Sequence, residues 1–251
     1  MHTAQILEST KEAKGLGIMI ADNLKSSCNC QAAYSKANRV LGMIRRFISY
    51  KSPEIMLPLY KTLVRPLVEY CTPAWSPHYS KDKCLLEKIQ HRFTRMIPGF
   101  AKLSYSTRLD RLHLWSLEER RNRADLIELF KIQKGLSGIS VSDLFEPNTA
   151  GRTRGHSLKL RKHYCRLDLR KHFFSERVVS KWNSLDEDTV AATSVNAFKT
   201  RLQHVRVTQR AEDKPIQGQL MSSRLQGLIS REIIFFLVRP HQVSYQVSNV
   251  Q

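Results

Sequence analysis

The chain has 251 residues, and its 41% hydrophobic content is sufficient for a buried core. Its 41 Lys and Arg residues outnumber its 22 Asp and Glu residues, which gives a formal net charge of +19 at pH 7. This excess favours a polyanionic partner, and nucleic acid over an acidic membrane, because the bases recur along the whole chain instead of forming one cluster. A charge that only keeps the protein soluble is the alternative.

The first predicted helix covers residues 33–48. Arg39 and Arg46, seven residues apart, lie on one side of it. Gly42 lies among the polar positions, where it removes a side chain from the basic face, although a merely tolerated Gly is the commoner case. The opposite, apolar stripe comprises Ala33, Ala37, Val40, Leu41, Ile44 and Ile48.

Prolines divide the next segment, residues 52–70. Ser52 and Pro53 are typical of the cap and the first position of a helix. Pro58 and Pro66 then interrupt the helical pattern. We therefore expect two short, kinked helical pieces instead of one rod.

Residues 80–97 are predicted to form another basic, amphipathic helix. Lys88 and Arg95 lie away from its apolar stripe, and Pro98-Gly99 ends it. The stripe comprises Leu85, Ile89, Phe93 and Met96.

Residues 105–136 have the pattern of a short helix, a turn and a longer helix. Ser116 and Glu119 have the spacing of a capping box at the start of the longer helix. We expect Arg121 and Asp125 to form an ordinary pair on the surface of that helix. Gly and Ser residues in 136–142, followed by "EPNTAG", indicate a linker and a domain boundary near residue 147.

Residues 152–171 form the most cationic stretch of the chain, in which Asp168 is the one acid. Alternating residue types predict a β-hairpin or ribbon around 157–169, then a helix from about Arg170 to Trp182 and a last helix at 194–203. Beyond about residue 205 the sequence is linker-like. It then contains a lone apolar run at 233–238, which is too short to span a membrane.

These segments predict a mainly α fold, a bundle of amphipathic helices with a small β-hairpin or ribbon around 157–169. The predicted organisation has four parts: a strand-containing region at 1–25, a helical domain at 26–146, a basic region at 147–205, and a partly disordered tail at 206–251. No segment predicts a membrane partner. Self-association through exposed apolar helix faces is a further expectation.

The cysteines indicate a reducing compartment. Their number is odd, five, and they are scattered, so they do not form a disulfide framework. Cys28 and Cys30 are too close for a zinc site of the usual spacing. The N-terminal residues contain no apolar signal region. We expect an intracellular protein, in the cytoplasm or nucleus, with no metal and no cofactor.

Seven motifs in register resemble one family. They are "KANRVLGMIRRF", "LYKTLVRPLVEYCTPAWSP", "LEKIQHRFTRMIPG", "LSYSTRLDRLHLWSLEERRNRADLIELFKI", "RTRGHSLKL", "LRKHFFSERVVSKWNSL" and "SVNAFKTRL". Together they resemble the C-terminal part of the reverse transcriptase of LINE-type, non-LTR retrotransposons of the jockey-like kind, over roughly residues 14–202. The resemblance implies that "KGLGIMI" is the strand at the end of the palm subdomain. The residues that follow would then be the thumb and post-thumb regions.

The resemblance also implies that the catalytic part is absent. Reverse transcriptases hold two divalent ions on clustered aspartates, which the family places upstream of this region, and the endonuclease domain lies further upstream still. No adjacent Asp-Asp pair occurs in this sequence. The acids at 186–188 are interpreted as a solvated turn. No Gly-rich phosphate loop follows any predicted strand, so we assign no catalytic residues.

The sequence therefore predicts a non-catalytic, nucleic-acid-binding fragment of a retrotransposon reverse transcriptase, which grips RNA or DNA through backbone phosphates without reading sequence. Binding is expected chiefly through residues 152–171. A retroelement relic without function, or a structural or interaction protein, is the alternative. By charge and helical phase, the predicted contacts are Arg39, Arg46, Lys88, Arg95, Arg152, Arg154, Lys159, Arg161 and Lys162.

Overall fold

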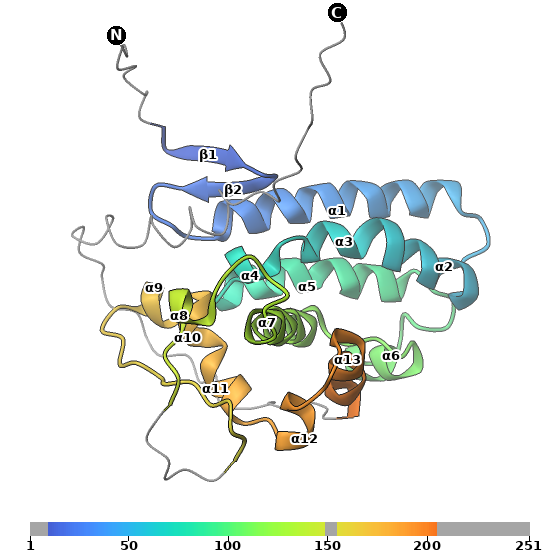
Figure 1. Ribbon diagram of the computed structural model, residues 1–251. Coiled ribbons are helices and arrows are strands. Elements are labelled where there is room, and N and C mark those ends of the chain that lie inside the picture. Colours follow the sequence, from blue (N-terminus) through green and yellow to red (C-terminus); the bar gives the residue numbers. More distant parts are fainter. Residues whose placement is uncertain (1–9, 149–154, 205–251) are drawn as a thin grey trace, which may run out of the picture. The chain divides into compact units, whose positions relative to one another are not determined.

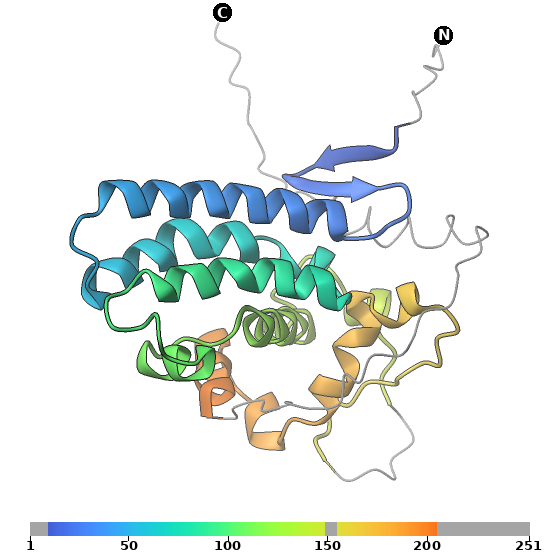
Figure 2. The same ribbon diagram turned by 180° about the vertical axis from the view of Figure 1, so that it is seen from behind.

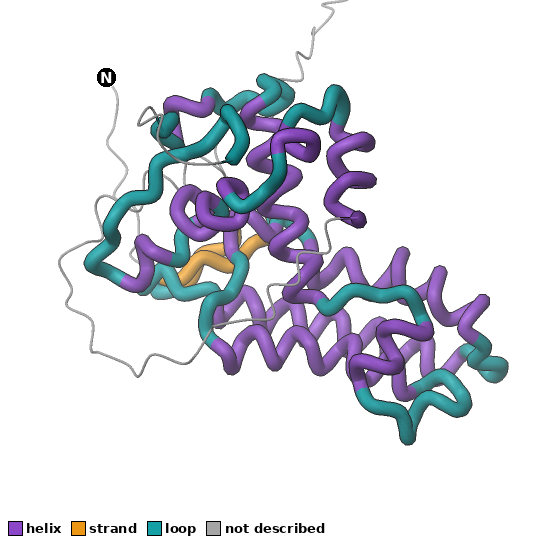
Figure 3. Tube along the Cα trace, turned by 90° about the horizontal axis from the view of Figure 1, so that it is seen from below, coloured by secondary structure: helices purple, strands orange, loops and turns teal. Residues whose placement is uncertain are grey.

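The computed structural model describes residues 10–148 and 155–204, and all of them belong to one compact unit of the chain. Helices dominate these residues, and one antiparallel hairpin is the only sheet among them (Figures 1 and 3). The prediction of a mainly α fold with a small β-hairpin is therefore confirmed. Arg152, Arg154 and the tail at 206–251 lie outside the described residues.

The elements follow one another in the order shown in Figure 1. They are β1 (Glu12–Gly15), β2 (Ile18–Ala21), α1 (Ser27–Phe47), α2 (Pro53–Leu59), the π-helical stretch η1 (Tyr60–Val64), α3 (Arg65–Glu69), α4 (Thr72–Trp75), α5 (Ser80–Arg95), α6 (Tyr105–Arg111), α7 (Leu117–Gln133), α8 (Val141–Leu144), α9 (Asp168–Lys171), α10 (Phe174–Arg177), α11 (Val179–Asn183), α12 (Glu187–Val190) and α13 (Val195–His204).

The hairpin lies at residues 12–21, not around 157–169 as the sequence predicted. Its turn residues Leu16 and Gly17 both have positive φ, 47° and 84°, as the twist of a two-residue hairpin loop requires. Within 157–169 the structure describes only an isolated bridge between Pro147 and Leu160. On one side, Lys159 and Arg161 make backbone hydrogen bonds with Asn148 and Glu146, at 2.9 and 2.8 Å. On the other side, the side chain of Asn183 bonds the N–H and C=O of Leu160, at 2.9 and 2.7 Å, where a further strand would otherwise pair.

Helices α1 and α5 pack side by side and run in the same direction (Figures 1 and 2). Near their starts, the Ser27 hydroxyl donates to Asp82 at 2.6 Å, and further along Arg92 donates to Asn38 at 2.6 Å. Both helices turn apolar stripes inward. The buried residues are Ala33, Ala37, Leu41 and Ile44 on α1, and Leu86, Ile89 and Phe93 on α5. Self-association would therefore use other apolar side chains, such as the exposed Met43, Phe47 and Leu63.

The proline-containing segment forms two short α-helices, α2 and α3, joined by η1. Pro66 has no N–H, so it cannot donate to the carbonyl of Thr62 as an α-helical residue would. A wider π-helical turn accommodates this missing bond. Nearby, the Thr62 hydroxyl donates to the carbonyl of Pro58 at 2.8 Å.

Helix α7 crosses α1 and α5 and is seen nearly end-on in Figure 1. The predicted capping box at its start is present, with Ser116 and Glu119 bonding reciprocally. Its far end stacks on α13 through Phe130 and Phe198, whose ring centroids are 4.3 Å apart. Trp182 of α11 is buried beside this pair and donates to the carbonyl of Leu158 at 2.8 Å. The segments before and after residue 147 therefore share a core.

The region from Arg170 to Trp182 forms α10 and α11 after a break, not one continuous helix. Phe173 is the cause, since its backbone is extended, with φ −68° and ψ 155°. This break ends the short helix α9 and lets Phe174 turn into the core, where it is buried.

Asp125 pairs with Arg177, not with Arg121 as the sequence predicted. The guanidinium of Arg177 donates to both carboxylate oxygens of Asp125, at 2.9 and 2.8 Å, and to the carbonyl of Pro73 at 2.7 Å. Arg121 is buried instead of lying on the surface. The Arg177–Asp125 pair therefore joins α7, α4 and α10 where helix periodicity alone indicated only a pair within α7.

We expect R177Q to lower the free energy of unfolding by about 3–5 kcal/mol, because it removes the guanidinium that bonds both carboxylate oxygens of Asp125, which is 1% exposed. Urea denaturation monitored by circular dichroism measures this change. The matched control is R161Q, which breaks the exposed Arg161–Glu146 pair and should change stability little. Equal decreases in stability of the two variants would contradict the structural importance of the Arg177–Asp125 pair.

Candidate nucleic-acid interface

Helix α1 contains no Asp or Glu among its 21 residues. Its apolar stripe is buried, so its cations are necessarily directed to the solvent-exposed sides of the helix. The exposed cations of α1 are Lys36, Arg39, Arg45 and Arg46.

Helix α5 contains two acids, and both are directed inward. Asp82 is 5% exposed and accepts the hydroxyl of Ser27. Glu87 accepts the hydroxyl of Tyr105 and, at 3.1 Å, the backbone N–H of Leu117. Burial raises the pKa of Glu87. The exposed side of α5 therefore contains cations and no acid; these cations are Lys81, Lys88, Arg92 and Arg95.

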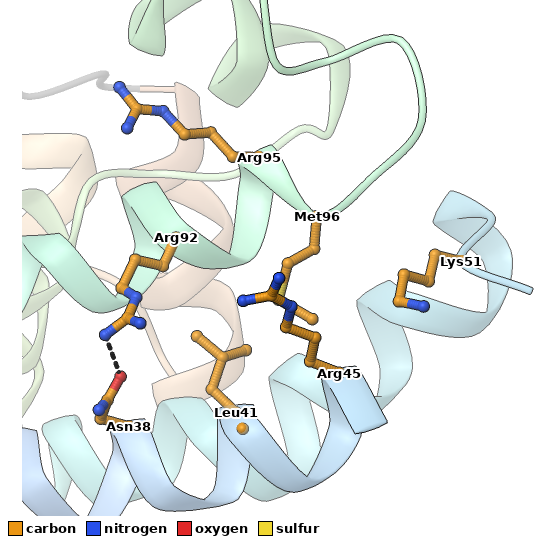
Figure 4. A pocket seen from close by; sticks show the side chains of 8 residues that line it. Asn38, Leu41, Arg45, Lys51, Arg92, Arg95 and Met96 are labelled. Carbon is orange, nitrogen blue, oxygen red and sulfur yellow. Dashed lines mark hydrogen bonds between the residues drawn. The ribbon is translucent and has the colours of Figure 1, made fainter. Parts of the chain in front are cut away.

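We call these exposed sides of α1 and α5, taken together, the cationic face. Toward the ends of the two helices it contains a hollow of about 510 Å³ (Figure 4). Arg45 of α1 and Arg92 of α5 approach this hollow from opposite helices, while Arg95 extends away from them. Among the described residues, no acid lines it; the lining consists of Asn38, Leu41, Gly42, Arg45, Lys51, Arg92, Arg95 and Met96.

Two details shape this hollow. The hydrogen bond from Arg92 to Asn38 fixes one guanidinium against α1. At Gly42 the hollow is lined by backbone alone, and the space beside it is open, since a Cβ at this position would meet no atom within 4 Å. A backbone without a side chain lets a ligand approach α1 closely between the two arginines.

Positive charge also surrounds the last turns of α5. Burial lowers the pKa of His91, and the nearby guanidinium groups of Arg108 and Arg95 lower it further. Arg108 is buried beneath this turn and donates to the carbonyl of His91 and the hydroxyl of Thr94, at 3.0 and 2.7 Å. Both acceptors are neutral oxygens, so these hydrogen bonds do not cancel the positive charge of Arg108.

Of the four predicted phosphate-contacting residues on α1 and α5, one lines the hollow and three do not. Arg39, Arg46 and Lys88 are exposed on the cationic face outside the hollow, and Arg95 lines it. Sequence analysis missed Arg45, Lys51 and Arg92. The spacing of Lys88, Arg92 and Arg95 could have indicated Arg92, because residues four and seven positions apart share a helix face.

In the basic region, two of the predicted phosphate-contacting residues already bond other side chains of the protein. Arg161 pairs with Glu146 at 3.1 Å, and Lys162 donates to the hydroxyl of Ser180 at 2.6 Å. Lys159 is half-buried. Just after α9, the ring of His172 stacks on that of His78, which precedes α5, with centroids 4.5 Å apart. Helix α9 therefore lies near the beginning of α5, whereas the hollow lies near its end.

His163 holds the basic region against two carboxylates. Its Nδ1 lies 3.0 Å from Glu176 and its Nε2 lies 3.3 Å from Glu146. Only the imidazolium carries a proton on both nitrogens and can donate to both partners. Hydrogen bonds with Glu176 and then Glu146 raise the pKa of His163. Arg161 and Arg170 contact the same two carboxylates, so this clasp is a cluster of three cations and two acids.

We expect the clasp to make stability depend on pH. Because folding raises the pKa of His163, its contribution is fully present below the unfolded value of about 6.5 and is lost as the pH rises through the folded value. H163Q should therefore be less stable than the parent below about pH 6.5 and approach it at higher pH. Thermal melts between pH 5.5 and 8.5 measure the difference, with H204Q on α13 as control. A difference independent of pH would contradict the clasp.

Comparisons with family models, curated proteins and solved structures returned no match. Among the described helices, none is long and apolar enough to cross a membrane. No group of three or more His, Cys, Asp or Glu side chains within residues 10–148 and 155–204 is arranged to hold a metal ion. The function must therefore be inferred from the residues of the chain itself.

Proposed function

We propose that this chain binds RNA or DNA through backbone phosphates, without sequence preference, and that α1 and α5 provide the principal surface. The observation that carries this proposal is the arrangement of charge on the cationic face. Two parallel helices expose cations along their length, while both acids of α5 are turned inward and α1 has none. Phosphates would meet no opposing carboxylate of either helix there.

The chemistry of the exposed groups supports backbone contacts more than base recognition. Lys and Arg side chains on the surface of a helix neutralise phosphates and release condensed counterions, which drives binding to any sequence. The hollow adds geometry to this charge. Arg45 and Arg92 lie on opposite sides of it, so one phosphate could receive hydrogen bonds from both helices.

The origin of the chain is part of the same proposal. The motifs "KANRVLGMIRRF" and "LEKIQHRFTRMIPG", which resemble LINE-type reverse transcriptases, lie within α1 and across the end of α5. In such a polymerase, a non-catalytic helical region with a cationic face would hold the template and the growing strand. An intracellular setting, in the cytoplasm or nucleus, is consistent with these partners.

A structural role is the alternative, and one observation favours it. Arg45 and Arg46 lie in the last turn of α1, and Arg92 and Arg95 in the last turn of α5. Cations at these positions stabilise a helix by interacting with the partial negative charge of its C-terminus. If this were their only role, their replacement would lower stability and leave binding unchanged.

The triple variant R45Q/R92Q/R95Q tests the proposal. Fluorescence anisotropy with a labelled DNA duplex at several salt concentrations should show weaker binding. The slope of log affinity against log salt should be flatter by roughly 0.9 for each phosphate that the variant no longer neutralises. R161Q/K162Q should have a smaller effect on binding of this duplex, because both residues lie outside α1 and α5 and Arg161 is already paired with Glu146.

The matched control is K11Q/K14Q/K25Q, which removes the same charge at exposed positions outside α1 and α5. If this control flattens the salt slope as much as the triple variant, net charge alone explains binding. If the triple variant binds like the parent but melts at a lower temperature, the cations are structural. No measurable binding by the parent would refute the proposed function.

We also expect no primer extension by this chain on an RNA template with Mg²⁺. The sequence has no adjacent aspartates to hold the two metal ions that nucleotidyl transfer requires. Incorporation of labelled nucleotide is the measurement, with a preparation of R177Q purified in parallel as a control for contaminating polymerase. Incorporation that co-purifies with the parent chain through successive columns would contradict the expectation.

A further inference from the structure

The basic region displays an aromatic side chain with unusual exposure. Tyr164 is 91% exposed, the largest fraction among the exposed large hydrophobic residues that the structure describes. Between residues 159 and 167 the sequence contains no Asp or Glu. A fully solvated ring within a cationic segment has no role in packing the core, so it is available to an external partner.

The backbone on both sides of Tyr164 is held in place. Leu160 is buried, and the side chain of Asn183 bonds both of its backbone groups. His163 is clasped between Glu146 and Glu176, the latter only 4% exposed. Tyr164 is therefore presented from a segment whose neighbouring residue is fixed by side-chain contacts.

Exposure alternates along this segment. Residues 162, 164 and 166 are exposed, whereas 163, 165 and 167 are half-buried. This alternation is typical of extended backbone, in which residues two apart project on the same side. Lys162 and Arg166 therefore flank Tyr164 on its exposed side, each about 7 Å away along the chain. The hydroxyl of Ser180, which Lys162 contacts, does not neutralise its charge.

We propose that Tyr164 is a stacking platform for an unpaired base, with Lys162 and Arg166 contacting the phosphates on either side of it. An aromatic ring between cations fits single-stranded nucleic acid, because every base has a face that can stack, whereas the bases of a duplex are already stacked on one another. The inference rests on the proposed nucleic-acid binding and adds to it a preference for single strands.

The test compares three ligands of equal length: oligo(dT), the same backbone with abasic sites in place of the bases, and a duplex. Y164A should bind oligo(dT) at least about fivefold more weakly than the parent, as expected when one base no longer stacks on an aromatic ring. It should bind the abasic strand as the parent does, since the phosphates remain. Y164F, which keeps the ring, should bind all three ligands like the parent.

A second variant gives a direct signal. Y164W places an indole at the proposed platform, and its fluorescence should be quenched by oligo(dT) but not by the abasic strand. Trp75 and Trp182 are buried and Trp115 is half-buried, so the parent titrated with the same ligands provides the background. Y70A is the matched control, because Tyr70 is an aromatic residue that is 58% exposed and lies outside α1, α5 and the basic region; it should bind all three ligands like the parent.

The outcomes separate the inference from the proposed function. If Y164A binds oligo(dT) as the parent does, or if its affinity for the abasic strand falls by the same factor, Tyr164 does not stack on bases, while phosphate binding by the cationic face stands. If Y70A weakens binding to oligo(dT) as much as Y164A does, the effect is not specific to Tyr164 and the inference fails. If the parent binds none of the three ligands, the proposed function fails as well.

Discussion

The apolar stripe of α1, which includes Ala37, Leu41 and Ile44, packs against the stripe of α5, and the positions of the other side chains on both helices follow from this contact. Burial of each stripe fixes the rotation of its helix, because an apolar stripe exposed to water would cost about 25 cal/mol for each Å² left unburied. The remaining sides must then face solvent. In these two helices, those sides are rich in Lys and Arg, so the packing of the core also determines where positive charge accumulates.

Three acids contribute to this asymmetry by serving as internal links. Asp82 connects α5 to the start of α1, Glu87 connects it to the start of α7, and Asp125 connects α7 to α10. An acid with a buried donor cannot also screen a surface cation. The net charge of the chain is consequently displayed on the surface with fewer compensating carboxylates than the composition implies.

The basic region is organised differently from the cationic face. It is not a regular element but an extended segment held by side chains, with Asn183 bonding the backbone of Leu160 and two carboxylates bonding His163. Such anchoring leaves every second residue free to contact a partner. Regular helices thus present a row of cations that fits phosphates, whereas the anchored segment presents an aromatic ring between cations, and the two surfaces suit different parts of a nucleotide chain.

Sequence alone determined the features that depend on nearby residues. Helical periodicity predicted α1 and α5 and the exposure of Arg39, Arg46, Lys88 and Arg95, and the spacing of Ser116 and Glu119 predicted the cap of α7, because these effects act within one or two helical turns. Only the tertiary structure decided that Arg45 and Arg92 share a hollow, that Asp125 pairs with Arg177, and that Leu160 bonds Asn183 instead of a further strand. Each of these contacts joins residues that are distant along the chain. Periodicity fixes which side of a helix is buried, but the flank that meets a given neighbour depends on how all the stripes pack together.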